Sequence, residues 1–269
     1  MGHYVAVEED VHIYVEDIGE GQPVVFIHGW PVNHKMYEYQ INELPKHGYR
    51  FIGIDLRGYG QSDKPWSGYD YNQMADDVKG VVDAMELENF VLAGFSMGGP
   101  IALRYMARHK QQGVSKLLLL APAAPSFTQR ENFPYGMEKK DVDGIIDNLN
   151  TDRPKMLEDF GGMFFGSENI SDVFKTWFHG LGMEAGSYST IHSAEALRDE
   201  DSFEDLSSIT VPAESFHGKN DQICPFEFSG ELQKGINDLK VVPFENSGHG
   251  LFVDEKEKFN QELLRFLKE

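Results

Sequence analysis

The chain has 269 residues, 41% of them hydrophobic, which is enough for one large α/β domain with its own core. A formal net charge of −20 argues against nucleic acid or anionic lipid as a partner, because both repel an acidic surface. The single cysteine, Cys224, excludes an internal disulfide, and no membrane span or signal peptide is visible, so we expect a cytoplasmic protein.

Short β-like runs alternate with helical patterns up to residue 121, which predicts a mostly parallel sheet covered by helices. The strands expected in this part are 11–15, 24–27, 50–54, 90–95 and 116–120. Between the third and the fourth, apolar residues recur at helical spacing: Met74, Val78, Val81, Val82 and Met85. They predict an amphipathic helix lying on the sheet.

A Gly-Phe-Ser-Met-Gly turn stands between the strand 90–95 and a helical pattern that begins at Pro100. A strand-to-helix reversal this tight forces Ser96 into a strained conformation that lifts its hydroxyl clear of the sheet. Gly94 and Gly98 are needed because a Cβ at either position would collide with the neighbouring strand or helix. This context is typical of a nucleophilic serine.

The alternation stops between about residues 122 and 208, where aromatics and methionines are frequent and no strand pattern is visible. We interpret this stretch as a helical insertion, which divides the chain into core residues 1–121, a cap over 122–208, and core residues 209–269. Open α/β sheets bind ligands beyond the carboxyl ends of their strands, so a cap there would enclose the site.

The sheet pattern resumes with expected strands at 213–217 and 240–243, and the chain ends in an amphipathic helix. The loops after these two strands contain Asp221 and His249. A serine hydroxyl needs a base within hydrogen-bond reach, and that base needs an orienting carboxylate. We therefore predict a catalytic triad of Ser96, Asp221 and His249.

Other histidines have weaker contexts. His28 is expected to brace the backbone of its own turn. Surface positions are expected for three histidines on or beside helices: His34, His47 and His109. Two fall in the cap, with a structural role as the default: His179 and His192. Asp55 stays open as an alternative acid because it also follows a strand, although an Asp–Arg pair in a Gly-rich turn usually fixes the loop.

Acyl transfer also needs donors aimed at the oxygen that becomes negative. In this geometry one donor is the backbone N–H of the residue after the nucleophile, Met97. The other comes from the loop His28-Gly29-Trp30-Pro31 after an early strand. Proline has no N–H, so we predict that Trp30 supplies the second donor.

These features resemble the α/β-hydrolase superfamily, and within it the cofactor-independent bacterial haloperoxidases, which are also aryl esterases and perhydrolases. The similarity runs through essentially the whole chain. It is carried by His28-Gly29-Trp30-Pro31, His47-Gly48-Tyr49-Arg50, 55–63, 94–99, Phe164-Phe165-Gly166, Val211-Pro212 and Ser247-Gly248-His249-Gly250.

The resemblance implies an α/β-hydrolase fold with an eight-stranded sheet, a helical cap inserted after strand 6, no metal and no cofactor. It implies hydrolysis of small carboxylic esters through an acyl-enzyme on Ser96, and attack by hydrogen peroxide to give a peracid. In that family a proline after the oxyanion tryptophan accompanies perhydrolase activity, and Pro31 matches it; alternatively, Pro31 only sets the φ of the loop.

The chain departs from the usual family pattern at two places. The segment His217-Gly218-Lys219-Asn220-Asp221 replaces the Gly-Asp-x-Asp form and leaves one acid, Asp221. Met97 is larger than the residue that several members carry there, and we expect it to narrow the acyl pocket.

Aromatic residues of the cap and the motifs predict an apolar pocket, and no arginine cluster marks an anion site. The residues expected to bind substrate are Phe95, Phe127, Phe160, Phe164, Trp177 and Phe252. The expected partner is a small-molecule ester, and a homo-oligomer stays open. Ser96 argues against dehalogenases and epoxide hydrolases, which need a carboxylate there. Hydrolysis of a lactam, thioester or carbon–carbon bond stays open, as does a ligand receptor with little turnover.

Overall fold

The computed structural model of the chain describes residues 1–167 and 170–269. Within them, eight strands form one sheet in the order β1-β2-β4-β3-β5-β6-β7-β8. The strands are β1 (Gly2–Glu8), β2 (Val11–Ile18), β3 (Gln22–Ile27), β4 (Tyr49–Ile54), β5 (Phe90–Phe95), β6 (Val114–Leu120), β7 (Ala213–Gly218) and β8 (Lys240–Phe244). Pairing is antiparallel for β1–β2 and β2–β4 and parallel throughout the rest, which confirms the mostly parallel sheet.

Each strand expected from the sequence is present, and β1 is the additional one. It forms the edge of the sheet, where Val5 is its one buried residue. The central strand β5 is buried over its whole length, as expected for a parallel strand covered on both faces.

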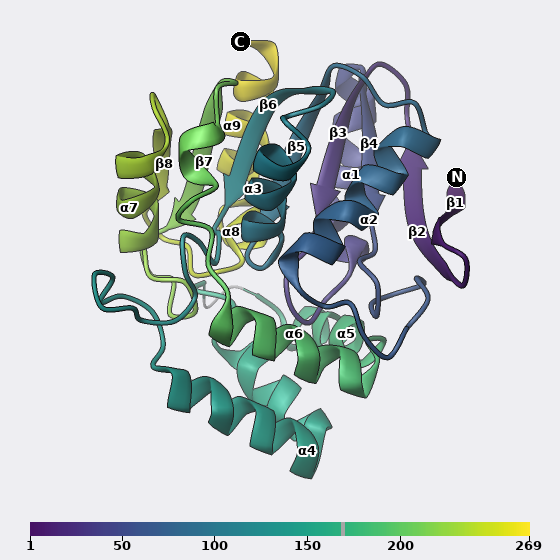
Figure 1. Cartoon of the computed structure of the whole chain (residues 1–269). Helices are drawn as coiled ribbons and strands as arrows, with labels where there is room; N and C mark the ends of the chain where they lie inside the picture. Colours follow the sequence, from purple (N-terminus) through teal and green to yellow (C-terminus); the bar gives the residue numbers. More distant parts are fainter. Residues whose placement is uncertain (168–169) are drawn as a thin grey trace.

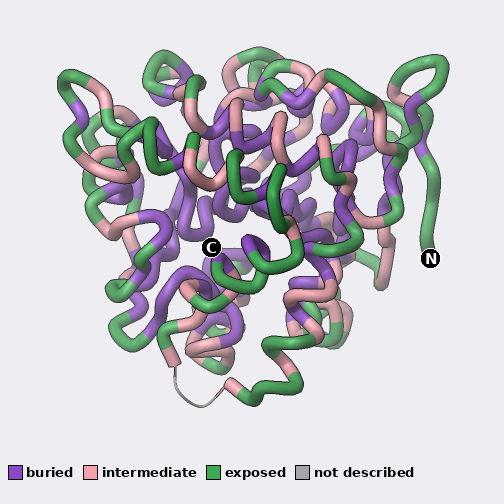
Figure 2. The backbone as a smooth tube through the Cα atoms, turned by 90° about the horizontal axis from the view of Figure 1, so that it is seen from below, coloured by how far each residue is buried: buried purple, intermediate pink, exposed green. Residues whose placement is uncertain are grey.

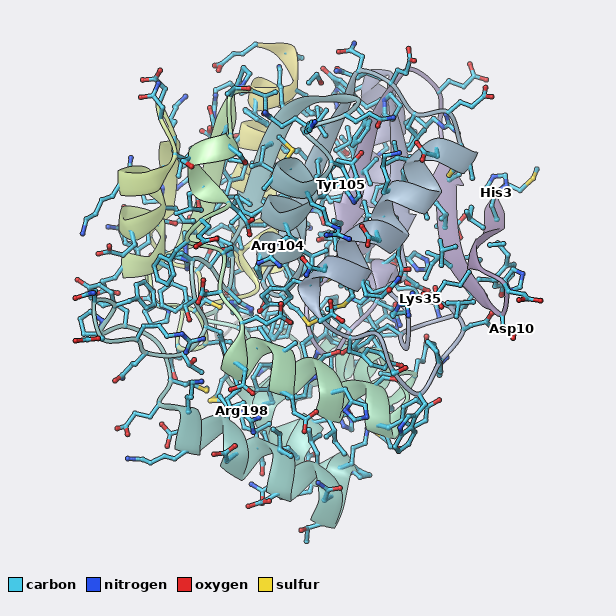
Figure 3. All side chains as sticks on the ribbon, in the orientation of Figure 1. His3, Asp10, Lys35, Arg104, Tyr105 and Arg198 are labelled. Carbon is cyan, nitrogen blue, oxygen red and sulfur yellow. The ribbon has the colours of Figure 1, made fainter. Side chains whose placement is uncertain are left out.

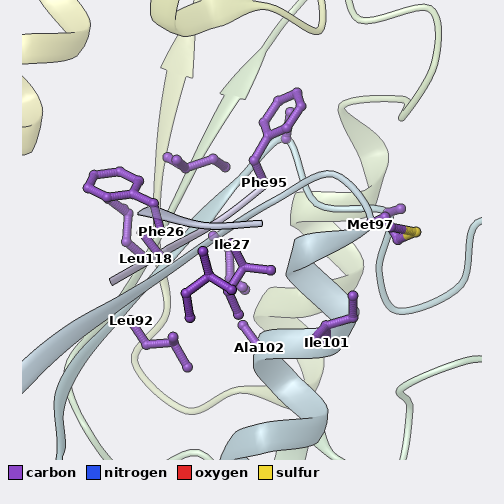
Figure 4. Close-up of a cluster of buried hydrophobic side chains, with 14 of the residues drawn as sticks. Phe26, Ile27, Leu92, Phe95, Met97, Ile101, Ala102 and Leu118 are labelled. Atoms are coloured by element: carbon purple, nitrogen blue, oxygen red, sulfur yellow. The ribbon is translucent and has the colours of Figure 1, made fainter. Parts of the chain in front are cut away.

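Helices flank the sheet on both faces, with α2 and α3 packed together on one side and α9 on the other (Figure 1). The helical segments are η1 (His34–Tyr37), α1 (Glu38–Glu43), η2 (Leu44–His47), α2 (Tyr71–Ala84), α3 (Gly98–Arg108), α4 (Lys139–Gly162), α5 (Asp172–Met183), α6 (Ser187–Asp199), η3 (Leu206–Ser208), α7 (Glu227–Gly235), α8 (Leu251–Asp254) and α9 (Lys256–Lys268). Four residues of the expected apolar stripe are buried in α2, namely Met74, Val78, Val81 and Val82, whereas Met85 lies just beyond the helix and is partly buried. Figure 4 shows part of this core, where side chains of β3, β5, β6 and α3 meet.

The segment between β6 and β7 carries α4, α5 and α6, which lie together beyond the carboxyl ends of the parallel strands (Figure 1). Helix α4 consists of two helical stretches separated at Asp152, whose φ of −148° and ψ of 79° are not helical. Pro154 follows two residues later, and the Asp152 carboxylate accepts the Lys155 N–H to start the second stretch. Figure 2 shows the molecule from this side, with buried segments between the exposed ones.

Two polar networks attach the outer layers to the sheet. Arg57, after β4, forms a buried ion pair with Asp77 of α2 at 2.5 Å and reaches Glu8 of β1 at 2.7 Å. Arg104 of α3, labelled in Figure 3, hydrogen-bonds the carboxylate of Asp205 at 2.9 Å, beyond the end of α6. Among the described residues, no helix is both long and apolar enough to cross a membrane.

Candidate active site

Ser96 occupies the turn between β5 and α3 in a left-handed conformation, with φ of +51°. A Cβ on Gly94 would lie 2.3 Å from the Gly98 carbonyl oxygen, and one on Gly98 would lie 2.5 Å from the Ile27 carbonyl oxygen. Both glycines are therefore required for the close contact of strand and helix, as the sequence predicts. The turn is held further by the Ser96 carbonyl, which accepts the N–H groups of Gly99 and Ala123.

Asp221 and His249 meet in the loops after β7 and β8, with both side chains fully buried. The Nδ1 of His249 lies 2.7 Å from Oδ2 of Asp221, and Oδ1 of Asp221 accepts the N–H groups of Ile223 and Cys224. Burial opposes ionisation, but attraction to His249 and hydrogen bonds from His217 and His249 outweigh it and hold the pKa of Asp221 well below its usual range. An ionised carboxylate accepts only, so His249 carries its hydrogen on Nδ1.

The second nitrogen of His249, Nε2, is buried and has no hydrogen-bond partner among the described residues. The imidazole lies against two phenyl rings, with centroids 4.7 Å away for Phe95 and 4.9 Å for Phe164. Phe252 packs edge-on against Phe95 at 5.3 Å. Two residues expected to bind substrate, Phe95 and Phe164, therefore pack against the base, and a third, Phe252, packs behind Phe95.

An apolar cavity opens beside Ser96 and holds about 360 Å³ of space free of atoms, part of it open to solvent. Its lining consists of Trp30, Ser96, Phe127, Val142, Ile145, Phe160, Ala194, Leu197 and Ile223. Three aromatics singled out in the sequence are among them: Trp30, Phe127 and Phe160. The aliphatic lining residues lie on α4, on α6 and in the loop after β7. Nothing in the sequence distinguishes them from ordinary core residues.

The remaining aromatics expected to bind substrate do not line this cavity within the described residues. They are Phe95, Phe164, Trp177 and Phe252. Trp177 packs in α5, where its ring lies 5.1 Å from that of Phe174 and 6.4 Å from that of Phe178. Aromatic content alone placed it in the pocket, whereas the structure places it on the outer part of the insertion.

The backbone N–H groups of Trp30 and Met97 donate to no protein acceptor within the described part of the chain. Both are thus available to an oxygen placed beside Ser96. The indole Nε1 of Trp30 donates to the Thr190 carbonyl at 2.9 Å, which holds the ring against α6. The Met97 side chain belongs to the buried core (Figure 4) and does not line the cavity, so the expectation that it narrows the pocket is wrong.

Other buried polar groups brace the loops that follow β3 and β4. His28 Nε2 accepts the Leu56 N–H at 3.0 Å and Nδ1 donates to the Gly29 carbonyl, so it braces backbone as expected. Burial lowers the pKa of His28 to about 4, which keeps the ring neutral. Asp55 accepts the ring N–H of His34 at 2.7 Å and the backbone N–H of Gln61, which fixes the loop.

The structure corrects the expectation for one histidine, His34, and adds another, His217, to the surroundings of Asp221. His34 is buried rather than on the surface, because its ring pairs with the buried Asp55. The sequence pattern predicts no role for His217, yet its Nε2 lies 3.4 Å from Oδ2 of Asp221. His47 is exposed, His109 is partly exposed, and the two histidines of the insertion contact local partners, the Pro154 carbonyl for His179 and Glu195 for His192.

Cys224 lies in the loop after β7 that also carries Asp221, and it is completely buried. Burial, together with repulsion from Asp221, raises the pKa of its thiol well above the usual value. The thiol is therefore neutral and a poor nucleophile.

A carboxylate attaches the insertion to the loop that carries His249. Oδ2 of Asp254 accepts the N–H groups of Gly248 and Gly166 at 2.8 Å each, and Oδ1 accepts that of Ser167 at 3.1 Å. The Gly250 N–H donates to the Phe164 carbonyl at 2.7 Å. We call these contacts the Asp254 clamp; they fix 164–167 directly on the His249 loop.

Comparison with known proteins agrees with this arrangement. A family model described as alpha/beta hydrolase fold matches residues 22–256. The chain is 58% identical to the AB hydrolase superfamily protein YisY of Bacillus subtilis (strain 168), over 99% of both chains. It is 31% identical to the bifunctional esterase/perhydrolase DCH of Acinetobacter calcoaceticus, over 98% of this chain and 99% of the relative.

Among solved structures, the esterase EaEST from Exiguobacterium antarcticum superposes with a TM-score of 0.98 at 50% identity, covering all of both chains. The sheet order, the inserted helices and the Ser96 turn thus occur in a chain whose relatives are esterases and haloperoxidases. This chain belongs to the α/β-hydrolase family that includes esterases and non-heme haloperoxidases, and it is an esterase-like hydrolase.

Proposed function

We propose that the protein cleaves small, apolar carboxylic esters through an acyl-enzyme on Ser96. One observation carries the proposal: Ser96, Asp221 and His249 lie in the turns that follow the parallel strands β5, β7 and β8, His249 contacts Asp221, and Ser96 lines an apolar cavity. An oriented imidazole with a bare, buried Nε2 is the base that a serine nucleophile needs.

The reaction has two halves in this scheme. In the first, Ser96 Oγ attacks the ester carbonyl carbon while His249 Nε2 takes the hydroxyl proton, and the N–H groups of Trp30 and Met97 stabilise the oxyanion. The alcohol leaves with that proton, and the acyl group stays on Ser96. In the second half, His249 takes a proton from water, the hydroxide attacks the acyl carbon, and the carboxylic acid leaves as Ser96 regains its proton.

The lining of the cavity beside Ser96 supports the proposal that the acyl group of the substrate is uncharged. Ser96 is its one polar lining residue, and no lysine or arginine lines it within the described residues. A charged acyl chain would lose its hydration there without gaining a partner. Five lining residues come from α4 and α6, namely Val142, Ile145, Phe160, Ala194 and Leu197. We therefore also propose that residues 122–208 act as a cap on a core formed by 1–121 and 209–269.

A second acceptor, hydrogen peroxide, is proposed for the same acyl-enzyme. Attack by its oxygen on the acyl carbon would release a peracid and return the proton to Ser96. Two features support this reaction: Pro31 follows the proposed oxyanion residue, and a relative of nearly equal length is named an esterase/perhydrolase.

The decisive experiment measures hydrolysis of p-nitrophenyl acetate and butyrate by the wild type and by Ser96→Ala. We expect turnover by the wild type and its loss in the variant. Ser202→Ala is the matched control, because this buried serine bonds the Pro125 carbonyl away from the site, and it should retain activity.

Two further arms test the substrate class. A p-nitrophenyl hemisuccinate, with a charged acyl chain, should be a much poorer substrate than the butyrate, and addition of peroxide should produce peracid only when Ser96 is present. Ester hydrolysis that persists in Ser96→Ala would refute the mechanism. Ser96-dependent turnover confined to thioesters or lactams would replace the ester class.

A further inference from the structure

Asp221 has a second histidine beside it, which the proposed mechanism does not use. The His217 ring, at the end of β7, is fully buried. Its Nε2 lies 2.7 Å from the Cys224 carbonyl oxygen and 3.4 Å from Oδ2 of Asp221, the oxygen that also accepts from His249. Its Nδ1 lies 2.8 Å from Oγ of Ser229.

The partners of His217 assign its hydrogen. A carbonyl oxygen only accepts, so Nε2 carries a hydrogen that points between Cys224 O and Asp221 Oδ2. Nδ1 shares a hydrogen bond with the Ser229 hydroxyl, which in turn bonds the Ser215 hydroxyl at 2.8 Å. Both nitrogens of the buried ring therefore have partners.

Cys224 closes the arrangement into a ring of contacts. Its N–H donates to Oδ1 of Asp221 while its carbonyl accepts from His217, so one peptide segment joins the carboxylate and the second imidazole. The ring fixes both the position of the carboxylate and the direction of Oδ2. Oδ2 is the atom that sets the tautomer and orientation of His249.

We propose that His217 is a positioning residue for Asp221, acting on the reaction only through the Asp221–His249 contact. The inference rests on the proposed function of Ser96. Without the Nε2 hydrogen, the 221–224 loop loses its anchor, and Asp221 holds the His249 imidazolium less well as the proton leaves Ser96.

The test compares two substitutions of His217, each of which places an amide near a different nitrogen of the imidazole. His217→Gln places an amide N–H near the position of Nε2, whereas His217→Asn reaches only the position of Nδ1. His109→Gln is the matched control, since it alters another His–Asp pair, that with Asp76 at the end of α3 opposite Ser96. Each variant is assayed for kcat and KM on p-nitrophenyl butyrate, for the rate at which a fluorophosphonate labels Ser96, and for melting temperature.

We expect His217→Asn to lower both kcat and the labelling rate by about 10- to 100-fold, the weight of one hydrogen bond to a charged group, with KM nearly unchanged. His217→Gln should recover most of this loss, and His109→Gln should retain kcat. The low-field proton resonance of the His249–Asp221 bond should weaken in His217→Asn and persist in His217→Gln.

Equal losses in the two His217 variants that follow their melting temperatures would show a purely structural role and overturn the proposal. Wild-type kcat and labelling in both would overturn it as well. Failure of the Ser96 mechanism itself would be distinguishable from failure of the His217 proposal. In that case Ser96→Ala would keep its turnover, or the fluorophosphonate would label another residue.

Discussion

Phe160 separates two cavities, and its removal should lengthen the acyl chain that the protein accepts. The ring stands edge-on against Trp30 at 4.7 Å and lines the cavity beside Ser96. It also lines a second pocket with about 240 Å³ of space free of atoms, part of it open to solvent, whose other walls include Pro31, Leu157 and Phe178. Phe160→Ala would join the two spaces.

The size of the effect follows from burial of methylene groups. Each buried CH₂ is worth about 0.8 kcal/mol, or about a fourfold gain in kcat/KM. The ratio of kcat/KM for p-nitrophenyl hexanoate to that for the butyrate should therefore rise about 15-fold in Phe160→Ala. The variant should lose about 3 kcal/mol of stability, the lower end for Phe→Ala, because the ring already borders empty space.

Val142→Ala is the control, since Val142 lines the Ser96 cavity and not the second one. It should leave the hexanoate preference close to that of the wild type. A folded Phe160→Ala protein with an unchanged ratio would show that the acyl chain does not point toward Phe160, and would refute the assignment of this cavity.

Two other residues give independent tests. Asp221→Asn should lower kcat by about 10³- to 10⁴-fold on p-nitrophenyl butyrate, because an amide favours the wrong tautomer of His249. Because its folded-state pKa is depressed, ionised Asp221 stabilises the fold above the unfolded value of about 3.9, and this contribution is lost as the pH falls below it. The stability gap between wild type and Asp221→Asn in urea unfolding should therefore narrow below about pH 4 and stay constant above it; a gap that widens in acid would contradict this sign. Arg57→Met should cost about 3–5 kcal/mol in urea unfolding by leaving Asp77 buried without its partner, and adding Asp77→Leu should recover most of that loss; equal stability of the single and double variants would refute the reasoning.

The positions of the parallel strands along the chain and the Ser96 turn could be predicted from the sequence, because local sequence patterns decide them. A buried parallel strand is a continuous apolar run, and the turn after β5 admits only glycine at positions 94 and 98. Strand β1 was not predicted because it is an exposed edge strand, and its residues form no continuous apolar run. Its place is set by pairing with β2.

Long-range contacts explain what the sequence could not predict about the site. His34 resembles a surface residue until Asp55, far along the chain, is seen to lie beside it. His217 sits inside a strand, where its polarity has no local explanation, and only the fold brings it to Asp221. Trp177 and Phe160 have the same aromatic character, and only the packing of α4 and α5 decides which of them borders the cavity.

The Asp254 clamp has a consequence for protein engineering. Insertions of this kind invite exchange between relatives as a way to change specificity. Here the segment 164–167 shares its hydrogen bonds with Gly248, Gly250 and Asp254, and a Cβ on Gly166 would lie 2.4 Å from the Gly248 nitrogen. A chimera that transplants the insertion alone would displace the loop of His249. Segments 164–167 and 248–254 are one unit of exchange, and a functional graft has to carry both.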